Sequence, residues 1–174
     1  IDLEGGAGND AFQVGQLFGT ARIAPDVAPE DAFTTTLTTC GNLSRGVSFA
    51  TVANGGLGDD TFSVYSNKAN LNLNGDDGND SITIRAFALA DQSGATPMHP
   101  VLYNVNAPVA IDGGNGFDQT AIIGTELNDN FVITHAGIYG AGINATYVRV
   151  ETLEVNGMEG DANFFVLSTR PEVA

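Results

Sequence analysis

The sequence is poor in several residue types on which common protein functions depend. Its 174 residues include no tryptophan, one cysteine, two histidines and six basic residues against 21 acidic ones, which gives a formal net charge of −15. The single lysine and the scattered arginines form no basic stripe that could neutralise phosphates, so neither nucleic acid nor an anionic membrane surface is an expected partner. No apolar run approaches the roughly 20 residues of a membrane-spanning helix, so membrane insertion is not expected either.

The few cysteine and histidine residues also argue against catalysis. His99 and His135 lack the spacing of a metal-binding pair, and no nucleophile elbow, phosphate-binding loop or paired-histidine motif occurs. Cys40 has no partner for an internal disulfide and is predicted to pack in the core. The sequence therefore predicts a protein that is not an enzyme.

What the sequence does contain is a repeated glycine-rich turn. Each copy leads through an acidic or amide residue into a short alternation of apolar and polar residues, which is typical of a β-strand. The first two copies are the clearest; the copy at 113–122 keeps all three glycines but has Thr120 in place of the large apolar residue, and the other copies lose glycines or the aspartate. The six copies are residues 5–14 (GGAGNDAFQV), 55–64 (GGLGDDTFSV), 75–84 (GDDGNDSITI), 113–122 (GGNGFDQTAI), 124–133 (GTELNDNFVI) and 157–166 (GMEGDANFFV).

The turn composition has two physical explanations. Glycine at the first, second and fourth positions permits backbone conformations closed to other residues, so that carbonyl oxygens can point to a common centre while the aspartate adds a charged oxygen. Such hard oxygens are the ligands that calcium prefers. Glycine, asparagine and aspartate are equally the residues that any tight turn favours without metal, and that reading stays open.

The pattern G-G-x-G-x-D-x-U-x in these copies resembles the calcium-binding repeats of the repeats-in-toxin (RTX) family of secreted bacterial proteins. The resemblance implies a parallel β-solenoid with Ca²⁺ between neighbouring turns on one edge. Copies 124–133 and 157–166 are expected to be structural turns with weak metal binding or none, because glycines or the aspartate are missing there. The implied ligands are the carboxylates of Asp60 and Asp80 with carbonyls around Gly55, Leu57, Gly75 and Asp77, followed by Asp10, Asp118 and, more weakly, Asp129.

The spacing of the copies predicts how the chain winds. Twenty residues separate Asp60 from Asp80, enough for a strand, a turn, a second strand and a return. The step from Asp118 to Asp129 is about half as long, which predicts that these two turns lie on opposite edges. Strand alternation and the lack of helical periodicity predict an all-β, mainly parallel β-solenoid. The residues expected to face its core are Leu71, Leu73, Ile82 and Ile84, together with stacked Phe12, Phe62, Phe131 and Phe164.

The whole chain, residues 1–174, is predicted to form a single solenoid domain, and because it opens within a repeat and shows no terminal caps, we expect it to be part of a longer array. Excursions at residues 15–54 and 86–107 interrupt the rhythm. Strands are predicted within them or beside them at 34–39, 47–52, 82–87 and 101–105, with a surface loop at 92–100. Because binding residues tend to lie on loops held by a rigid scaffold, the excursions are the expected place for any specific partner.

The resulting expectation is a calcium-stabilised, extracellular structural or adhesin-type repeat segment of a large bacterial surface or secreted protein. Millimolar extracellular calcium would occupy even weak sites of this kind. A self-assembling filament or surface-layer subunit is one alternative, and an accessory β-helix domain of a secreted toxin or polysaccharide-modifying enzyme is another. Besides calcium, the expected partners are further copies or neighbouring repeats and a glycan or cell-surface ligand.

Overall fold

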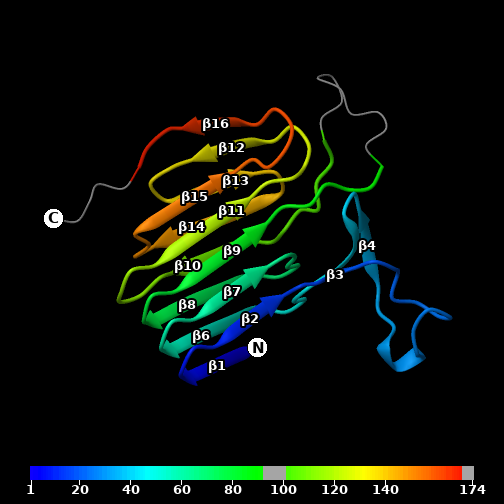
Figure 1. Ribbon diagram of the computed structural model, residues 1–174, viewed down its shortest axis with the longest axis horizontal. Helices are drawn as coiled ribbons and strands as arrows, with labels where there is room; N and C mark the ends of the chain where they lie inside the picture. Colours follow the sequence, from blue (N-terminus) through cyan, green and yellow to red (C-terminus); the bar gives the residue numbers. More distant parts are fainter. Residues whose placement is uncertain (92–100, 170–174) are drawn as a thin grey trace.

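The chain folds into two large, mostly parallel sheets and a small third sheet beside them (Figure 1). The computed structural model describes residues 1–91 and 101–169. Sheet A runs in spatial order through β1 (Asp2–Ala7), β6 (Thr51–Leu57), β8 (Leu71–Asp77), β10 (Val109–Asp112), β14 (Ile143–Val148), β13 (Gly137–Gly140), β12 (Asn130–Ile133) and β16 (Asn163–Val166). Sheet B runs through β15 (Thr152–Asn156), β11 (Gln119–Ile123), β9 (Ser81–Arg85), β7 (Thr61–Val64) and β2 (Ala11–Val14).

Along the sequence, strands of sheet A and sheet B alternate as strand pairs: β1 with β2, β6 with β7, β8 with β9, β10 with β11, and β14 with β15. Successive pairs stack in parallel, so that Ala53 lies opposite Leu73 in sheet A and Phe62 opposite Ile82 in sheet B. Thr61 lies opposite Ser81, which confirms that one circuit takes 20 residues. The prediction of an all-β, mainly parallel architecture is confirmed.

The apolar core lies between sheets A and B. Leu71, Leu73, Ile82 and Ile84 are all buried, as the alternation predicted, because a strand directs every second side chain to the same face. The phenylalanine rings stack in two pairs, Phe12 on Phe62 with centroids 4.9 Å apart and Phe131 on Phe164 with centroids 5.8 Å apart. Phe164 is nevertheless 45% exposed, since β16 is the last strand of sheet A.

One strand breaks the parallel order. The antiparallel strand β13 lies between β14 and β12, which places β14 rather than β12 beside β10. Its hairpin with β14 turns through Gly140, Ala141 and Gly142, all of which have positive φ. This antiparallel insertion was not predicted, and it makes sheet A mixed.

The first excursion forms the side sheet, with β3 (Leu17–Phe18), β5 (Gly41–Ser44) and β4 (Thr35–Thr38) in spatial order, and one turn of 3-10 helix, η1 (Pro29–Asp31). It projects from the body near β2 (Figure 1). The Arg22 guanidinium lies 5.1 Å from the Phe18 ring centre and 5.5 Å from that of Phe33, and these cation–π contacts hold the long connection against the side sheet.

Of the strands predicted in or beside the excursions, some are confirmed and others are wrong. The strand predicted at 34–39 is confirmed by β4, and the one at 82–87 by β9. The strand predicted at 47–52 is confirmed only at its last two residues, because β6 begins at Thr51. The one at 101–105 is wrong, because only an isolated bridge joins Tyr103 to Ala88. The loop predicted at 92–100 lies outside the described residues.

Sheets A and B are joined along two edges. On the turn edge, the chain passes from sheet A to sheet B through residues 8–10, 58–60, 78–80, 113–118 and 149–151. On the return edge it passes back from B to A, and the first excursion, the described parts of the second, and the 124–129 and 157–162 turns lie there. In Figure 1 the turn edge is on the left and the side sheet is on the right. The predicted placement of the Asp118 and Asp129 turns on opposite edges is confirmed.

Candidate metal centre

Four motif aspartates form a column along the turn edge, here called the aspartate column: Asp10, Asp60, Asp80 and Asp118. In each step the Oδ1 of one aspartate accepts the backbone N–H of the aspartate in the preceding strand pair. The N···O distances are 2.7 Å from Asp10 to Asp60, 2.7 Å from Asp60 to Asp80 and 2.8 Å from Asp80 to Asp118. The parallel register of β2, β7, β9 and β11 places the four residues in line.

The second carboxylate oxygen of each column aspartate has no such partner. The Oδ2 atoms of Asp10, Asp60, Asp80 and Asp118 are all buried and have no hydrogen-bond donor within the described part of the chain. Burial, together with the neighbouring carboxylates of Asp118 and Asp60, raises the pKa of Asp80 to about 6. Burial likewise raises the pKa of Asp118. Because a buried charge without a partner is costly, a cation or a proton beside these oxygens would stabilise the column.

The first glycine of each motif allows two oxygens to approach each other. A Cβ added to Gly5 would lie 2.7 Å from the Asp10 Oδ2 and 2.5 Å from the Gly55 carbonyl oxygen. Cβ atoms at Gly55, Gly75 and Gly113 would likewise overlap a column carboxylate and the carbonyl of the next turn. The Cα–H groups of these glycines, which are only weak donors, lie against both oxygens, and no described donor reaches the carboxylate Oδ2 atoms. Such a set of hard oxygens fits calcium.

The second and fourth glycines are required by the backbone conformation as well as by close approach. In the 55–60 turn, Gly56 and Gly58 have φ values of 102° and 119°, a region that side chains with a Cβ rarely adopt. Asp76 occupies the second position of the next turn and keeps a positive φ of 70°. Backbone freedom therefore explains positions two and four, where an added Cβ at Gly56 or Gly58 would also overlap a carbonyl of the preceding turn, whereas close approach alone explains position one.

The predicted carbonyl ligands fall into two groups. Those of Gly55 and Gly75 face the aspartate column, as described above. The Leu57 carbonyl instead accepts the N–H of Gly8 at 2.7 Å, and the Asp77 carbonyl accepts that of Gly58 at 2.9 Å. The Leu57 and Asp77 carbonyls are therefore already engaged in hydrogen bonds between stacked turns.

An outer row of side chains ties the turns together in the opposite direction. The Asn9 Oδ1 accepts the Asp59 N–H at 3.0 Å, the Asp59 Oδ1 accepts the Asn79 N–H at 2.8 Å, and the Asn79 Oδ1 accepts the Phe117 N–H at 3.0 Å. Asp59 is exposed. This row explains the amide or acid at the fifth motif position by hydrogen bonding alone.

Asp129 is not part of the aspartate column. It lies on the return edge, where its Oδ2 accepts the Thr125 N–H at 2.6 Å and its Oδ1 accepts the Thr125 hydroxyl at 2.9 Å. Both carboxylate oxygens therefore have donors within the turn itself. In the stacked strands Asn130 lies opposite Asn163, which sets Ala162, rather than a second aspartate, at the position beside Asp129.

Glu151 is a member of the site that the sequence analysis missed. Its Oε2 accepts the Asp118 N–H at 2.8 Å and so continues the column by one step. The 149–151 turn contains no glycine, and its one sequence signal is an acid just before a strand. Arg149 in the same turn pairs with Asp112 through two nitrogen–oxygen contacts of 2.6 and 2.7 Å.

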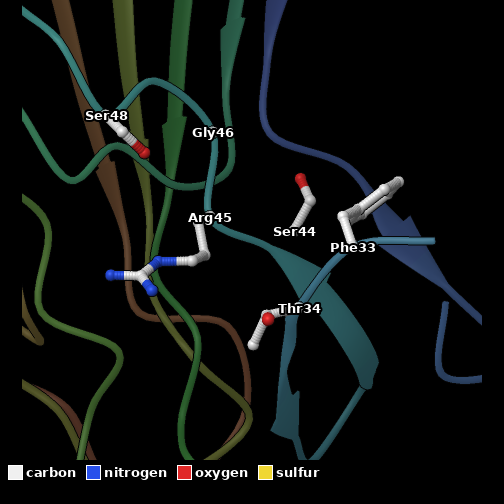
Figure 2. Close-up of a pocket in the computed structure, with 6 residues that line it drawn as sticks. All are labelled: Phe33, Thr34, Ser44, Arg45, Gly46 and Ser48. Carbon is white, nitrogen blue, oxygen red and sulfur yellow. The ribbon is translucent and has the colours of Figure 1, made fainter. Parts of the chain in front are cut away.

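A hollow of about 400 Å³ lies where the side sheet meets the body (Figure 2). Its lining contains three hydroxyl groups, one aromatic ring and one guanidinium, and no carboxylate: Phe33, Thr34, Ser44, Arg45, Gly46 and Ser48. Figure 2 shows the Arg45 side chain directed away from Phe33. This hollow belongs to the first excursion, where the sequence analysis placed a possible partner.

The cysteine and the described histidine both lie apart from the aspartate column. Cys40 is exposed, so the prediction that it packs in the core is wrong; it lies in the tight turn between β4 and β5, where its N–H bonds to the Thr38 hydroxyl and its thiol reaches Glu126. His135 is exposed and contacts the Ser168 hydroxyl, with its ring Nδ1 3.2 Å away. His99 lies outside the described residues.

Within the described ranges no group of three or more histidine, cysteine, aspartate or glutamate side chains is close enough to hold a metal ion by itself, so carbonyl oxygens would have to contribute to any site. None of the helical structure in those ranges could span a bilayer. Compared with known proteins, the chain matches no family model, no curated protein and no solved structure.

Proposed function

We propose that the chain is a calcium-stabilised β-solenoid segment with a structural or adhesin role on the surface of, or outside, a bacterial cell. In this proposal each strand pair is one coil and each turn of the turn edge contributes to a ladder of ion sites, as the resemblance to RTX repeats implies. The observation that carries the proposal is the aspartate column, with its four buried and unpartnered carboxylate oxygens.

The chemistry of the column favours calcium over other neutralising groups. The converging atoms are carboxylate and carbonyl oxygens, with no nitrogen or sulfur ligand, which selects a hard cation. Calcium tolerates irregular sets of six to eight oxygens, whereas magnesium demands a tight octahedron. Bound calcium would supply positive charge to the column. Asp60 and Asp80 with the Gly55 and Gly75 carbonyls would hold it, and Asp10 and Asp118 would extend the ladder.

The net charge of −15 supports an extracellular setting for this role. Millimolar calcium would fill weak sites and offset the mutual repulsion of the carboxylates, whereas the low calcium inside a cell would leave them charged and repelling. Because binding free energy adds to folding free energy, export as an unfolded chain and folding outside would follow naturally. The chain would then serve as a rigid scaffold without catalysis.

An adhesin role is favoured by a specific feature of the first excursion. The hollow beside the side sheet offers hydroxyl groups and an exposed aromatic ring without carboxylates, a lining suited to a sugar. A filament or surface layer and an accessory domain of a secreted toxin or polysaccharide-modifying enzyme remain the alternative roles, and the gene context would separate them.

Thermal unfolding followed by circular dichroism tests the proposal, with excess chelator, a calcium titration and magnesium as the control ion. We expect a calcium-specific rise in Tm, because ions that bind only the folded chain stabilise it by RT ln(1 + [L]/Kd), about 2.7 kcal/mol at 100 times Kd. Equal melting with chelator and with calcium would refute calcium stabilisation and leave the glycine turns as structural turns.

A further inference from the structure

The turn between β14 and β15 replaces the motif with a sequence that the motif does not describe. Asp112 lies opposite Val148, and Gln119 lies opposite Thr152, so the six residues 113–118 are matched by only the three residues 149–151. Arg149 therefore takes the place of the first glycine and Glu151 the place of the aspartate. The longer glutamate side chain spans the shortened turn and still receives the Asp118 N–H at 2.8 Å.

The Arg149 carbonyl repeats the arrangement found at each earlier turn. A Cβ at Gly113 would overlap this carbonyl oxygen and would lie 2.6 Å from the Asp118 Oδ2. The carbonyl accepts no hydrogen bond from any described residue, and the Gly113 N–H instead bonds to the Val148 carbonyl at 3.1 Å. The Asp118 side chain is fully buried, and its Oδ2 has no described donor. Two acceptor oxygens thus converge here too.

The backbone of Arg149 is held in a conformation that ordinary residues avoid. Its φ is 49°, in the left-handed region, which costs a residue with a Cβ roughly 1 kcal/mol. The two contacts of its guanidinium with Asp112 offset that cost and direct the arginine's own charge outward, where the side chain is 59% exposed. The carbonyl is therefore turned toward Asp118 while the guanidinium is engaged elsewhere.

We infer that Asp118 and the Arg149 carbonyl form a further divalent-cation site, positioned by Glu151, which no copy of the motif marks. This inference rests on the proposed function, because it assigns the same kind of ion to one more step of the column. The ion would be calcium or another hard divalent cation. Glu151 is a positioning residue that holds the Asp118 backbone and adds negative charge at the end of the column.

Amide NMR of the ¹⁵N-labelled chain during a calcium titration tests the site directly. Coordination by a carbonyl perturbs the following amide, so the Val150 amide reports on Arg149 just as the Gly56 and Asp76 amides report on Gly55 and Gly75. We expect all three amides to shift. A silent Val150 amide beside shifting Gly56 and Asp76 amides would overturn the inference alone, whereas silence at all three would overturn the proposed function with it.

Two variants separate the ion site from general folding. In Glu151→Ala, we expect the calcium midpoint at Val150 to rise at least 10-fold, while the midpoints at Gly56 and Asp76 stay within about twofold of the wild type. In Arg149→Gly, which keeps the carbonyl, relaxes the left-handed φ and removes the pair with Asp112, we expect the midpoint at residue 150 to be retained within about threefold. An unchanged midpoint in Glu151→Ala, or loss of the site in Arg149→Gly, would overturn the assignment.

Discussion

The same glycine-rich motif occurs on the turn edge and on the return edge, but its aspartate makes different contacts on the two edges. In the 75–80 turn, the aspartate gives one oxygen to a neighbouring backbone and keeps the other buried without a donor. In the 124–129 turn, both oxygens of the aspartate are bonded to Thr125. A motif aspartate therefore becomes a candidate ligand only where stacked turns bring a carbonyl to it and the turn itself leaves an oxygen free.

The largest expected loss of stability comes from filling the space beside the first glycine of a turn-edge motif. Gly75→Ala would drive a methyl group into the Asp80 carboxylate and the Gly113 carbonyl, neither of which can move without unstacking the turns. We expect a loss of about 3 kcal/mol in unfolding free energy, the upper range for overpacking. Urea denaturation measures it. Gly19→Ala is the matched control, because no atom lies within 4 Å of its added Cβ, and it should change stability by less than about 0.5 kcal/mol.

The variants Asp80→Asn and Asp129→Asn test the difference between the two edges through their response to calcium. In chelator, we expect Asp80→Asn to gain about 1 kcal/mol, because the buried unpaired charge disappears and the amide can donate to a carbonyl. In saturating calcium it should instead lose about 2 kcal/mol relative to the wild type. Asp129→Asn should lose about 1 kcal/mol in both conditions. Parallel denaturation curves with and without calcium decide the matter, and identical behaviour of the two variants would contradict the distinction between the edges.

A smaller change tests why Asp129 is satisfied. Thr125→Val keeps the shape of the side chain but removes the hydroxyl that donates to the Asp129 Oδ1 at 2.9 Å. We expect a loss of about 1–2 kcal/mol, because a buried carboxylate oxygen is left without its donor. Thermal melts in chelator measure the loss. If added calcium stabilised this variant by more than it stabilises the wild type, the hydroxyl would be acting in place of an ion.

The smallest expected effect concerns the eroded glycine of the 75–80 turn. Asp76 holds a φ of 70°, and Asp76→Gly would relieve that conformation at the cost of a more flexible unfolded chain. We expect a net gain of about 0.5 kcal/mol. Because the change also removes a charge, Asp76→Asn is the control. A gain of the same size in Asp76→Asn would assign the effect to electrostatics instead of backbone strain.

Local patterns predicted the strands and turns of the repeats, but they misplaced strands in both excursions and did not predict which strands would be neighbours throughout sheet A. The alternation at Leu71, Leu73, Ile82 and Ile84 fixed which side chains face inward, and the repeat interval fixed the parallel stacking. The antiparallel β13 escaped prediction, since pairing depends on distant segments and the Gly140 to Gly142 turn resembles any other glycine-rich loop. The prediction that Cys40 is buried was wrong because the burial of a residue in a turn depends on which distant segments pack over that turn, and the local sequence does not show this.

The candidate site was predictable to a similar extent. The motif identified the four column aspartates, because the turn that carries them is local in sequence. It could not distinguish Asp129, whose oxygens are satisfied by a threonine at a motif position where glycine is usual. It also missed Glu151, because a shortened turn without glycine reaches the column only through the register of β14 and β15 with their neighbours.

The unequal spacing of the column has a consequence for the order of assembly. The hydrogen-bonded steps between successive members span 50, 20, 38 and 33 residues along the chain. Closing the 20-residue loop costs about 0.8 kcal/mol less entropy than closing the 50-residue loop. The β6–β9 segment is therefore the expected folding nucleus, onto which the flanking strands add. The first excursion lengthens the loop that must close before β1 and β2 can pair with β6 and β7, but it does not change where they dock.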